Sequence, residues 1–528
     1  MPPRQRASKS PARAARPAAS PAAPGKGAAA PADVSWAAQQ TPLGVFLNNY
    51  LAPLLTMLVT PYLAYVVTYI TSLPTPTISA FLDRCAARGV YGIHADIFAE
   101  LEPTAAAAVL LLVFNFVALL IYWWPGPTEH GPVTIHGHTP EYADNGVAHC
   151  ILFTLSFLGG SELGLGWYKL SVLYDHFGAT IGALNVFGLV FCAFLYIKGR
   201  HFPSGPDAGS SGCGLMFDYY WGMELYPRIC NVDVKKFVNC RFSMTFWQLA
   251  GISFCAASRE LHGRVDPGLL LCALSQFLYL AKFYVWEIGY TRMADRVRVR
   301  VPLPLQVPRV GDRVHALHRL HPLTRTRTLT LTLTLTLTRY MRSIDIIVDR
   351  AGFYETWGCI VWVPAVYTLH TRTAVNLPSG LSWPAALAIF AVGLLGVGLN
   401  FWADDQRQRF RAVKGDCLIW GKKPVYIEAA YSTVNPATGR TEQRTSLLLA
   451  SGWWGTARHN QYLFELMAAY SWGLLAGVHT HGCLPLFYPV FLTILLVHRA
   501  HRDEQKCIAK YGAHYEKYMA MVPREFEP

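Results

Sequence analysis

Long apolar stretches recur along almost the whole chain, and they constrain its fold more than any other feature. Each is about 20 residues long, enough for one helix to cross roughly 30 Å of hydrocarbon. With 52% hydrophobic and 15% charged residues among 528, the composition also favours a membrane protein over a soluble one. The sequence therefore predicts an all-α polytopic membrane protein with about ten transmembrane helices. We place these spans at about 50–71, 104–124, 146–166, 178–198, 243–259, 267–287, 353–372, 383–402, 462–478 and 481–498.

The formal net charge of +13 is concentrated in two segments. Residues 1–34 carry six Lys and Arg against one Asp, and residues 294–341 carry nine Arg against two Asp. The rest of the chain is therefore close to neutral, which argues against a nucleic-acid partner. We expect residues 1–34, rich in Ala and Pro, to form a disordered basic tail, although an organelle transit peptide has a similar composition.

Residues 294–341 form a low-complexity segment that ends in alternating Thr and Leu. A period-two pattern is formally that of a strand, but a lone strand of this kind would be an aggregation hazard. We interpret the segment as an insertion, a retained intron or a gene-prediction artefact, and predict that it carries no function. It divides the membrane body into residues 35–293, with six predicted helices, and residues 342–528, with four.

A basic run, His498 to Gly512, directly follows the last apolar stretch. Its cationic and imidazole side chains are suited to hold an anionic ligand, such as a phosphorylated cofactor, at the membrane surface. The alternative is interfacial anchoring, since Lys and Arg commonly flank membrane spans on the cytosolic side. With a cytosolic N-terminus, ten spans place this run and the polar stretch 403–460 together on the cytosolic side.

Three motifs carry a resemblance to a known family. The C-terminal run has the spacing His-Arg-x2-Arg-Asp-x3-Cys-x2-Lys-Tyr-Gly, residues 214–228 end in Glu-Leu-x-Pro-Arg, and residues 453–459 read Trp-Trp-Gly-Thr-Ala-Arg-His. These motifs resemble the signatures of the sterol reductase family, most closely its Δ7 type, the 7-dehydrocholesterol reductases. The resemblance covers about 35–293 and 342–523, and the chain departs from the family's pattern at its end, 522–528.

This resemblance implies an enzyme that uses NADPH to reduce the C7–C8 double bond of Δ5,7-sterols. It further implies a multi-pass protein of the endoplasmic reticulum membrane with a cytosol-facing NADPH pocket near its C-terminus. Expected partners are a sterol substrate and membrane lipid, with other sterol-biosynthesis enzymes as further candidates. The alternatives are a C-14 sterol reductase, a sterol-binding protein of the same fold without turnover, and, more distantly, an isoprenylcysteine methyltransferase-like enzyme.

The family's NADP contacts can be carried over position by position. Arg407 and Arg411 match phosphate-side ligands, and Leu449 with Trp454 matches the wall beside the dinucleotide. The remaining matches are Gln461, Tyr462, Asp503, Cys507, Lys510, Tyr511 and Tyr518. No G-x-G-x-x-G motif follows a strand, so cationic and aromatic groups would have to bind the dinucleotide. The alternative is that the arginines mark a helix end and the tryptophans an interfacial belt.

Reduction of a carbon–carbon double bond by hydride also requires a proton donor. Ionisable groups in or beside membrane spans are functional candidates by default. We favour Tyr284 and Glu287, which are three residues apart and so share a helical face, together with Asp345. The alternative is that Glu287 is a satisfied interfacial carboxylate.

Metal binding is not expected. His136 and His138 form a His-x-His pair in a Gly/Pro-rich loop without a third ligand nearby, and most such pairs bind no metal. The 12 cysteines contain no CxxC pair, so we interpret them as buried thiols and not as a zinc site or a disulfide framework.

Overall fold

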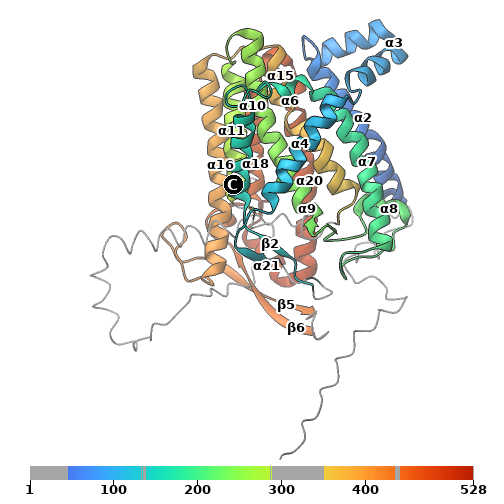
Figure 1. Cartoon of the computed structure of the whole chain (residues 1–528). Helices are drawn as coiled ribbons and strands as arrows, with labels where there is room; N and C mark the ends of the chain where they lie inside the picture. Colours follow the sequence, from blue (N-terminus) through green and yellow to red (C-terminus); the bar gives the residue numbers. More distant parts are fainter. Residues whose placement is uncertain are drawn as a thin grey trace, which may run out of the picture.

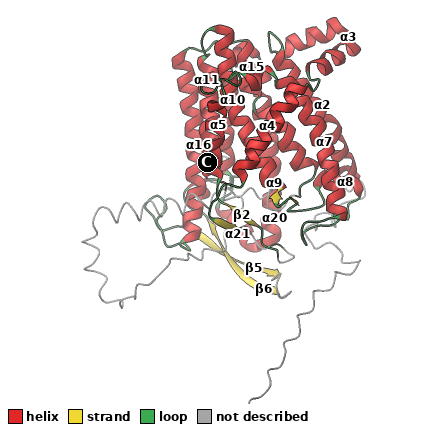
Figure 2. Ribbon diagram, in the orientation of Figure 1, coloured by secondary structure: helices red, strands yellow, loops and turns green. Residues whose placement is uncertain are grey.

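The computed structural model describes residues 46–131, 134, 138–285, 287, 350–434 and 441–526. Its long helices stand side by side in one bundle, and most short elements gather at one end (Figures 1 and 2). The predicted tail 1–34 and the predicted insertion 294–341 lie outside the described residues.

The described elements alternate between bundle helices and short connecting elements. Before the predicted insertion they are η3 (Leu47–Leu51), α2 (Ala52–Ser72), α3 (Ile78–Glu100), α4 (Ala105–Tyr122), β1 (Thr128–His130), β2 (Glu141–Ala143), α5 (Gly146–Gly160), α6 (Val172–Asp175), α7 (Phe177–His201), α8 (Leu215–Trp221), β3 (Arg228–Ile229), β4 (Val232–Asp233), α9 (Val234–Lys236), η4 (Phe237–Ser243), α10 (Met244–His262) and α11 (Pro267–Val285). After it come η8 (Phe353–Tyr367), α15 (Leu369–Asn376), α16 (Trp383–Ala412), β5 (Tyr426–Val434), β6 (Thr441–Leu449), α17 (Trp453–Thr456), α18 (Asn460–Leu475), α19 (Val478–His481), η9 (Leu484–Leu486), α20 (Phe487–Tyr511) and α21 (Ala513–Met521).

Every predicted span falls on a helical segment of the structure. Six helices among the described residues are long and apolar enough to cross a membrane, and they indicate a multi-pass membrane protein. They are Asn49–Ser72, Ala105–Tyr122, Phe177–His201, Pro267–Val285, Trp383–Ala412 and Leu484–Tyr511. The other predicted spans fall on α5, α10, η8 with α15, and α18, which are shorter or less apolar. The number ten therefore stays a prediction.

The structure adds an unexpected helix, α3, between the first two predicted spans. Thr77 caps it by accepting a hydrogen bond from the backbone N–H of Ala80 at 3.0 Å, and the helix bends at Gly89, where φ is +66°. Arg88 and Asp96 pair across the bend at 2.7 Å. α3 projects from the bundle at the end opposite β5 and β6 (Figure 1).

Three two-stranded antiparallel sheets in the described part of the chain also modify the predicted all-α fold. The longest pairs β5 with β6 over nine residues each, from Tyr426 opposite Leu449 to Val434 opposite Thr441. β-Branched and aromatic residues make up five of the nine residues of β5, and such residues favour extended backbone, whereas β6 has only two threonines of this kind. The composition of this region predicts only a polar stretch, so the hairpin is a feature that the structure adds.

The packed centre and the exposed surface agree with a bundle in lipid. Trp247 of α10 and Trp472 of α18 are only 2% and 1% exposed, and their rings meet edge to face with centroids 5.7 Å apart. In contrast, Leu112, Val190 and Ile494 on α4, α7 and α20 are 71%, 64% and 67% exposed. Such apolar exposure on candidate membrane helices is suited to hydrocarbon and not to water.

Candidate active site

Two long helices carry six of the eleven predicted cofactor residues in their last turns. α16 has 30 residues and so is about 45 Å long, which exceeds the roughly 30 Å of the hydrocarbon layer. Its last turns hold Arg407 and Arg411. α20, with 25 residues, similarly places Asp503, Cys507 and Lys510 in its last turns. β5 contacts α20 and α21, and β6 contacts α16, so the hairpin joins these helix ends (Figure 1).

Arg407 lies against the tryptophan wall that the motif predicted. Its guanidinium carbon is 3.7 Å from the centroid of the Trp454 ring, and Nη2 donates to Asp404 Oδ1 at 3.0 Å. Trp454 is fixed in turn, because its indole N–H donates to the backbone carbonyl of Ala403 at 2.7 Å. Leu449 packs in the same buried cluster as Trp454. The structure thus brings Arg407, Leu449 and Trp454 together.

α18 and α20 are joined by a second pair of predicted residues. The Tyr462 hydroxyl donates to Asp503 Oδ2 at 3.0 Å. The Tyr462 ring stacks on the imidazole of His459, with centroids 5.2 Å apart and planes 2° from parallel. This contact places the first turn of α18 directly beside the basic run of α20.

The tail residues form the outer part of the same cluster. The Lys510 ammonium lies 4.2 Å from the Tyr431 ring centroid on β5 and 5.1 Å from that of Tyr511. The Tyr518 hydroxyl on α21 donates to the backbone carbonyl of Trp454 at 3.1 Å. Cys507 packs against the apolar cluster that includes Tyr518. The predicted tail contacts therefore sit between the hairpin and the tryptophan wall.

Buried polar atoms without a hydrogen-bond partner occur at this end of α18 and α20. Among the described residues they include both ring nitrogens of His459, Gln461 Oε1 and Asp503 Oδ1. Unmet atoms also occur elsewhere in the described bundle. Buried polar groups in native proteins are nearly always satisfied, so those at this end of the bundle are candidates for contact with a ligand. The Arg407 guanidinium and the Lys510 ammonium carry positive charge of the kind that could hold the phosphate groups of such a ligand.

His459, Glu504 and Glu525 offer ligand atoms within 4.8 Å of one another, which is a spacing that a metal ion could use. A neutral imidazole can ligate a metal, but two guanidinium groups, those of Arg458 and Arg407, lie close enough to act on His459 and would repel a cation. Burial, and then the positive charges of Arg458 and Arg407, lower the pKa of His459 to about 4. Arg458 Nε also donates to Glu504 Oε1 at 2.5 Å, so this carboxylate already has a cationic partner. We therefore interpret the cluster as an anchoring contact.

The predicted proton donor Tyr284 belongs to a buried relay of hydroxyl and imidazole groups. Its hydroxyl lies 2.7 Å from Thr245 Oγ1, and Thr245 Oγ1 lies 3.0 Å from His149 Nε2. These residues come from α11, α10 and α5, and each is at most 2% exposed. A proton can therefore be held at, or passed along, this chain of groups.

Glu287, the second predicted donor, is held in a buried ion pair. Arg241 donates to both carboxylate oxygens at 2.8 Å, and Lys236 Nζ is 3.4 Å from Oε1. A carboxylate bound by a guanidinium fork and a second cation is favoured in its ionised form, which has no proton to give. This geometry favours the alternative of a satisfied carboxylate, while its role as donor stays an untested prediction. Asp345, the third candidate, lies outside the described residues.

A polar cluster inside the membrane body was missed by the sequence analysis. The Tyr279 hydroxyl donates to Glu465 Oε1 at 2.6 Å, and Lys282 Nζ donates to Asn400 Oδ1 at 2.7 Å. Asn400 Nδ2 in turn donates to the backbone carbonyl of Gln461 at 2.8 Å. The cluster therefore joins α11, α16 and α18 to a predicted cofactor residue. The available signal was the ionisable pair Lys282 and Glu465 within two predicted spans.

With this geometry in place, comparison with known proteins settles the family. The sequence matches the family described as "Ergosterol biosynthesis ERG4/ERG24 family" over residues 55–295 and 337–528. The chain belongs to the ERG4/ERG24 family. The predicted sterol reductase resemblance is thus confirmed at the level of the family.

Curated relatives of the chain include reductases of two specificities. A 7-dehydrocholesterol reductase of Arabidopsis thaliana is 36% identical over 81% of this chain and 85% of its own length. A Delta(14)-sterol reductase of Methylotuvimicrobium alcaliphilum is 31% identical over 81% of this chain and 83% of its own length. The Delta(14)-sterol reductase LBR of Gallus gallus is 28% identical over 80% of this chain and 56% of its own length.

The ERG4/ERG24 match is interrupted between residues 295 and 337, inside the stretch that we interpreted as an insertion. It resumes before η8 and continues to the end of the chain. All predicted cofactor residues and both described donor candidates lie within the matched ranges.

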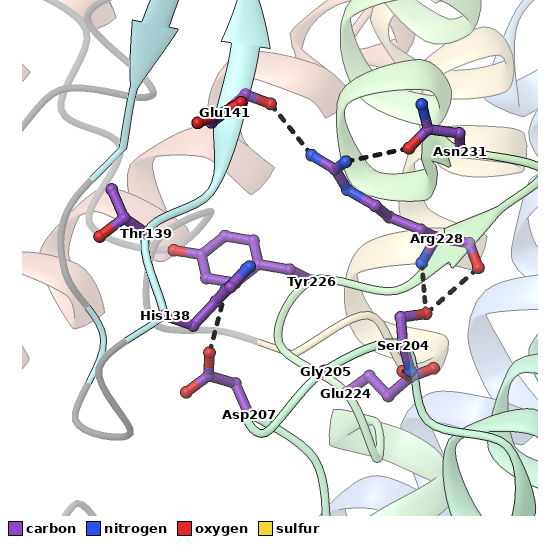
Figure 3. A pocket seen from close by; sticks show the side chains of 10 residues that line it. All are labelled: His138, Thr139, Glu141, Ser204, Gly205, Asp207, Glu224, Tyr226, Arg228 and Asn231. Carbon is purple, nitrogen blue, oxygen red and sulfur yellow. Dashed lines mark hydrogen bonds and ion pairs between the residues drawn. The ribbon is translucent and has the colours of Figure 1, made fainter. Parts of the chain in front are cut away.

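A separate polar pocket of about 380 Å³ lies beside the Glu-Leu-x-Pro-Arg motif of this ERG4/ERG24 chain (Figure 3). His138 Nδ1 faces Asp207 Oδ2 at 3.3 Å on one side. On the other side Arg228 donates to the backbone carbonyl of Glu141 at 3.0 Å. The motif thereby joins β3 to β2, and no predicted cofactor or donor residue lines this pocket. His136 lies outside the described residues.

Proposed function

We propose that this chain is an NADPH-dependent sterol reductase of the endoplasmic reticulum membrane that reduces the C7–C8 double bond of Δ5,7-sterols. The proposal rests mainly on two contacts at one end of the bundle, that of Arg407 with Trp454 and that of Tyr462 with Asp503. The identity of 36% with the Arabidopsis 7-dehydrocholesterol reductase supports the Δ7 specificity. A sterol and membrane lipid are the proposed partners, with other sterol-biosynthesis enzymes as further candidates.

The reaction divides the work between the cofactor and the chain. NADPH, when bound, supplies a hydride. Arg407 and Lys510 would hold phosphate groups at the aqueous end, while Tyr462 and Asp503 fix the neighbouring walls. Deeper in the bundle, buried aromatic rings such as Trp472 exclude water. This arrangement leaves the proton as the group that the membrane body must provide.

We propose the Tyr279–Glu465 pair as the source of that proton. Glu465 is one helical turn from Gln461 on α18, so the pair lies next to the candidate cofactor site. Loss of the phenolic proton leaves a tyrosinate, and the Lys282 ammonium, 5.5 Å from the Tyr279 ring centroid, is placed to stabilise that charge. A positioned acid of this kind contributes about 10²- to 10⁴-fold to a rate.

The Tyr284 relay is the alternative proton source, and Tyr284→Phe separates it from Tyr279→Phe. Both substitutions remove one hydroxyl from the same helix, so each serves as the matched control of the other. We expect Tyr279→Phe to lower kcat by about 100-fold or more and Tyr284→Phe by less than about tenfold. The reverse order would return the role to Tyr284, as the sequence analysis favoured.

The test of the function itself is expression in yeast that makes Δ5,7-sterols, followed by sterol profiling. Both the full chain and a chain without residues 294–341 are expressed, with protein levels checked by immunoblot. We expect loss of the C7–C8 double bond, at least in the shortened chain. Unchanged sterols in both strains, with the protein present, would refute the proposal.

A C-14 sterol reductase is the second candidate function. The observation in its favour is the identity of 31% with the Methylotuvimicrobium Delta(14)-sterol reductase, over a similar share of the chain. A second yeast strain that accumulates Δ8,14-sterols distinguishes the two. Consumption of these sterols with no effect on Δ5,7-sterols would assign the chain to the C-14 reaction.

A further inference from the structure

Arg458, between α17 and α18, is part of the Trp-Trp-Gly-Thr-Ala-Arg-His motif, but it is not one of the predicted cofactor contacts. Its side chain is only 7% exposed. Nε donates to Glu504 Oε1 on α20 at 2.5 Å, and Nη1 donates to the backbone carbonyls of Val522 and Pro523, both at 2.8 Å. The backbone N–H of Arg458 also donates to the carbonyl of Arg524 at 3.0 Å. One residue thus joins the start of α18, the end of α20 and the C-terminal segment.

The C-terminal segment continues along the next residue. The backbone N–H of His459 donates to the carbonyl of Glu525 at 2.8 Å. The His459 ring has Phe526 near one side, with centroids 6.0 Å apart, and stacks on Tyr462 with centroids 5.2 Å apart. We call residues 522–526 the C-terminal strap. Through His459, the strap fixes the ring of Tyr462.

The strap is anchored at its beginning by apolar packing. Val522 is 1% exposed and belongs to the cluster of Leu448, Tyr515 and Tyr518. Tyr518 donates to the backbone carbonyl of Trp454, which ties this cluster to the tryptophan wall. The strap therefore spans the distance between the wall that holds Arg407 and the Tyr462–Asp503 pair.

Glu504 completes the connection from the side of α20. It is adjacent to Asp503, which accepts the hydrogen bond of Tyr462, and its side chain is 12% exposed. The Arg458–Glu504 ion pair therefore sets the register between α20 and the start of α18. A lysine at position 458 cannot replace the planar fork that reaches a carboxylate and two carbonyls at once.

We propose that the C-terminal strap and the Arg458–Glu504 pair hold the cofactor side of the site in its binding geometry. Arg458 and Glu504 are positioning residues, because they act through His459, Tyr462 and Asp503. This inference rests on the proposed function, and it goes beyond it by assigning cofactor affinity to residues outside the predicted contacts. It follows that damage to the strap weakens NADPH binding while leaving sterol recognition deeper in the bundle unchanged.

The experiment uses the full chain, purified in detergent micelles. Arg458→Lys removes the fork and keeps the charge, while Glu504→Gln keeps the shape and removes the charge. Lys517→Arg and Glu516→Gln are the matched controls, because both side chains are exposed and lie in α21, close to the strap but outside it. For each protein the Kd of NADPH is measured by quenching of tryptophan fluorescence, and the KM of the sterol by turnover. Hydrogen exchange of the Arg458 and His459 amides reports the strap without any cofactor.

We expect Arg458→Lys and Glu504→Gln to raise the Kd of NADPH by about tenfold or more, as loss of a buried charged hydrogen bond does. The sterol KM should stay within about twofold, and both controls should bind NADPH like the wild type. Faster exchange of the Arg458 and His459 amides should accompany the loss in Arg458→Lys. If the wild type binds NADPH and the Arg458 and Glu504 variants bind it equally well, the role of the strap is refuted and the proposed function is unaffected. A wild type that binds no NADPH would overturn the proposed function, and the strap's cofactor role with it.

Discussion

The buried ion pair between Arg241 and Glu287 permits a test that separates structure from catalysis. Their side chains are 0% and 4% exposed, and two hydrogen bonds of 2.8 Å join them. Glu287→Gln keeps the shape but leaves a buried guanidinium without its counter-charge, with the Lys236 ammonium also nearby. Breaking such a pair from one side costs about 3–5 kcal/mol. We therefore expect Glu287→Gln to be strongly destabilised.

Removing both charges should cost less than removing one. In the double variant Arg241→Met with Glu287→Met, apolar side chains of similar length replace the pair, and such exchanges are often close to neutral. The remaining loss falls on two groups. The Lys236 ammonium loses the Glu287 carboxylate but keeps its hydrogen bond to the carbonyl of Ala143 at 2.6 Å. Asn145 loses a donor, because its Oδ1 accepts from Arg241 Nη2 at 2.7 Å. Leaving that buried acceptor unmet costs about 1–3 kcal/mol. The double variant should thus be more stable than Glu287→Gln.

The assay is thermal unfolding of detergent-solubilised protein, combined with sterol turnover at a temperature where all variants are folded. Glu260→Gln is the matched control, since Glu260 forms an exposed pair with Lys169 at 3.1 Å and its loss should leave Tm unchanged. We expect a fall of several degrees for Glu287→Gln, partial recovery in the double variant, and turnover in both. A folded Glu287→Gln with an unchanged Tm and no turnover would refute this reasoning and identify Glu287 as the proton donor.

Two further predictions concern the cofactor end. In the folded chain the pKa of His459 is about 4, below its ordinary value of about 6.5. As the pH falls, the imidazole is therefore protonated in the unfolded chain before it is protonated in the folded one. Up to about 3 kcal/mol of folding stability is lost in this way between pH 6.5 and 4. His459→Gln should therefore flatten the dependence of Tm on pH relative to the wild type and to the exposed control His479→Gln; equal slopes would contradict it. Gly452 has φ +61°, and a Cβ there would lie 2.1 Å from Gln406 Oε1. This buried oxygen accepts a hydrogen bond from the backbone N–H of Trp453 at 2.8 Å, so moving it out of the way breaks that hydrogen bond. Gly452→Ala should therefore lower Tm and NADPH affinity more than Gly421→Ala, whose glycine has φ +76° with open space around it; equal effects would show that backbone strain, and not the clash with Gln406, decides.

The sequence located the membrane spans and the cofactor end because both depend on local patterns. A run of about 20 apolar residues is visible without knowledge of its neighbours. The Trp-Trp-Gly-Thr-Ala-Arg-His motif and the C-terminal run likewise carry their spacing within themselves. The structure places Arg407 on Trp454 and Tyr462 on Asp503, in agreement with that reading. The roles of these residues in binding NADPH stay predictions.

The partners of buried charges could not be predicted in the same way. Glu287 and Arg241 are 46 residues apart in sequence, and Tyr279 and Glu465 are 186 apart. The packing of α11 against its neighbours decides which charged groups meet. That packing is not visible as a local pattern in the sequence. The β5–β6 hairpin was missed for another reason. The region is polar, and only β5 is rich in β-branched and aromatic residues, so β6 has no strand signal of its own.

α11 makes the choice of proton donor a question of geometry. Tyr279 and Tyr284 are five residues apart, which corresponds to about 140° around an α-helix. Tyr279 therefore faces Glu465 on α18, whereas Tyr284 faces Thr245 on α10 and, through it, His149. A donor must reach the same substrate as a hydride delivered from the Tyr462–Asp503 end of the bundle. Of the two described networks, the one around Tyr279 lies next to Lys282, whose bond to Asn400 leads on to Gln461 in that end of α18. The opposite faces of one helix thus make Tyr279→Phe and Tyr284→Phe a direct test of where the substrate lies.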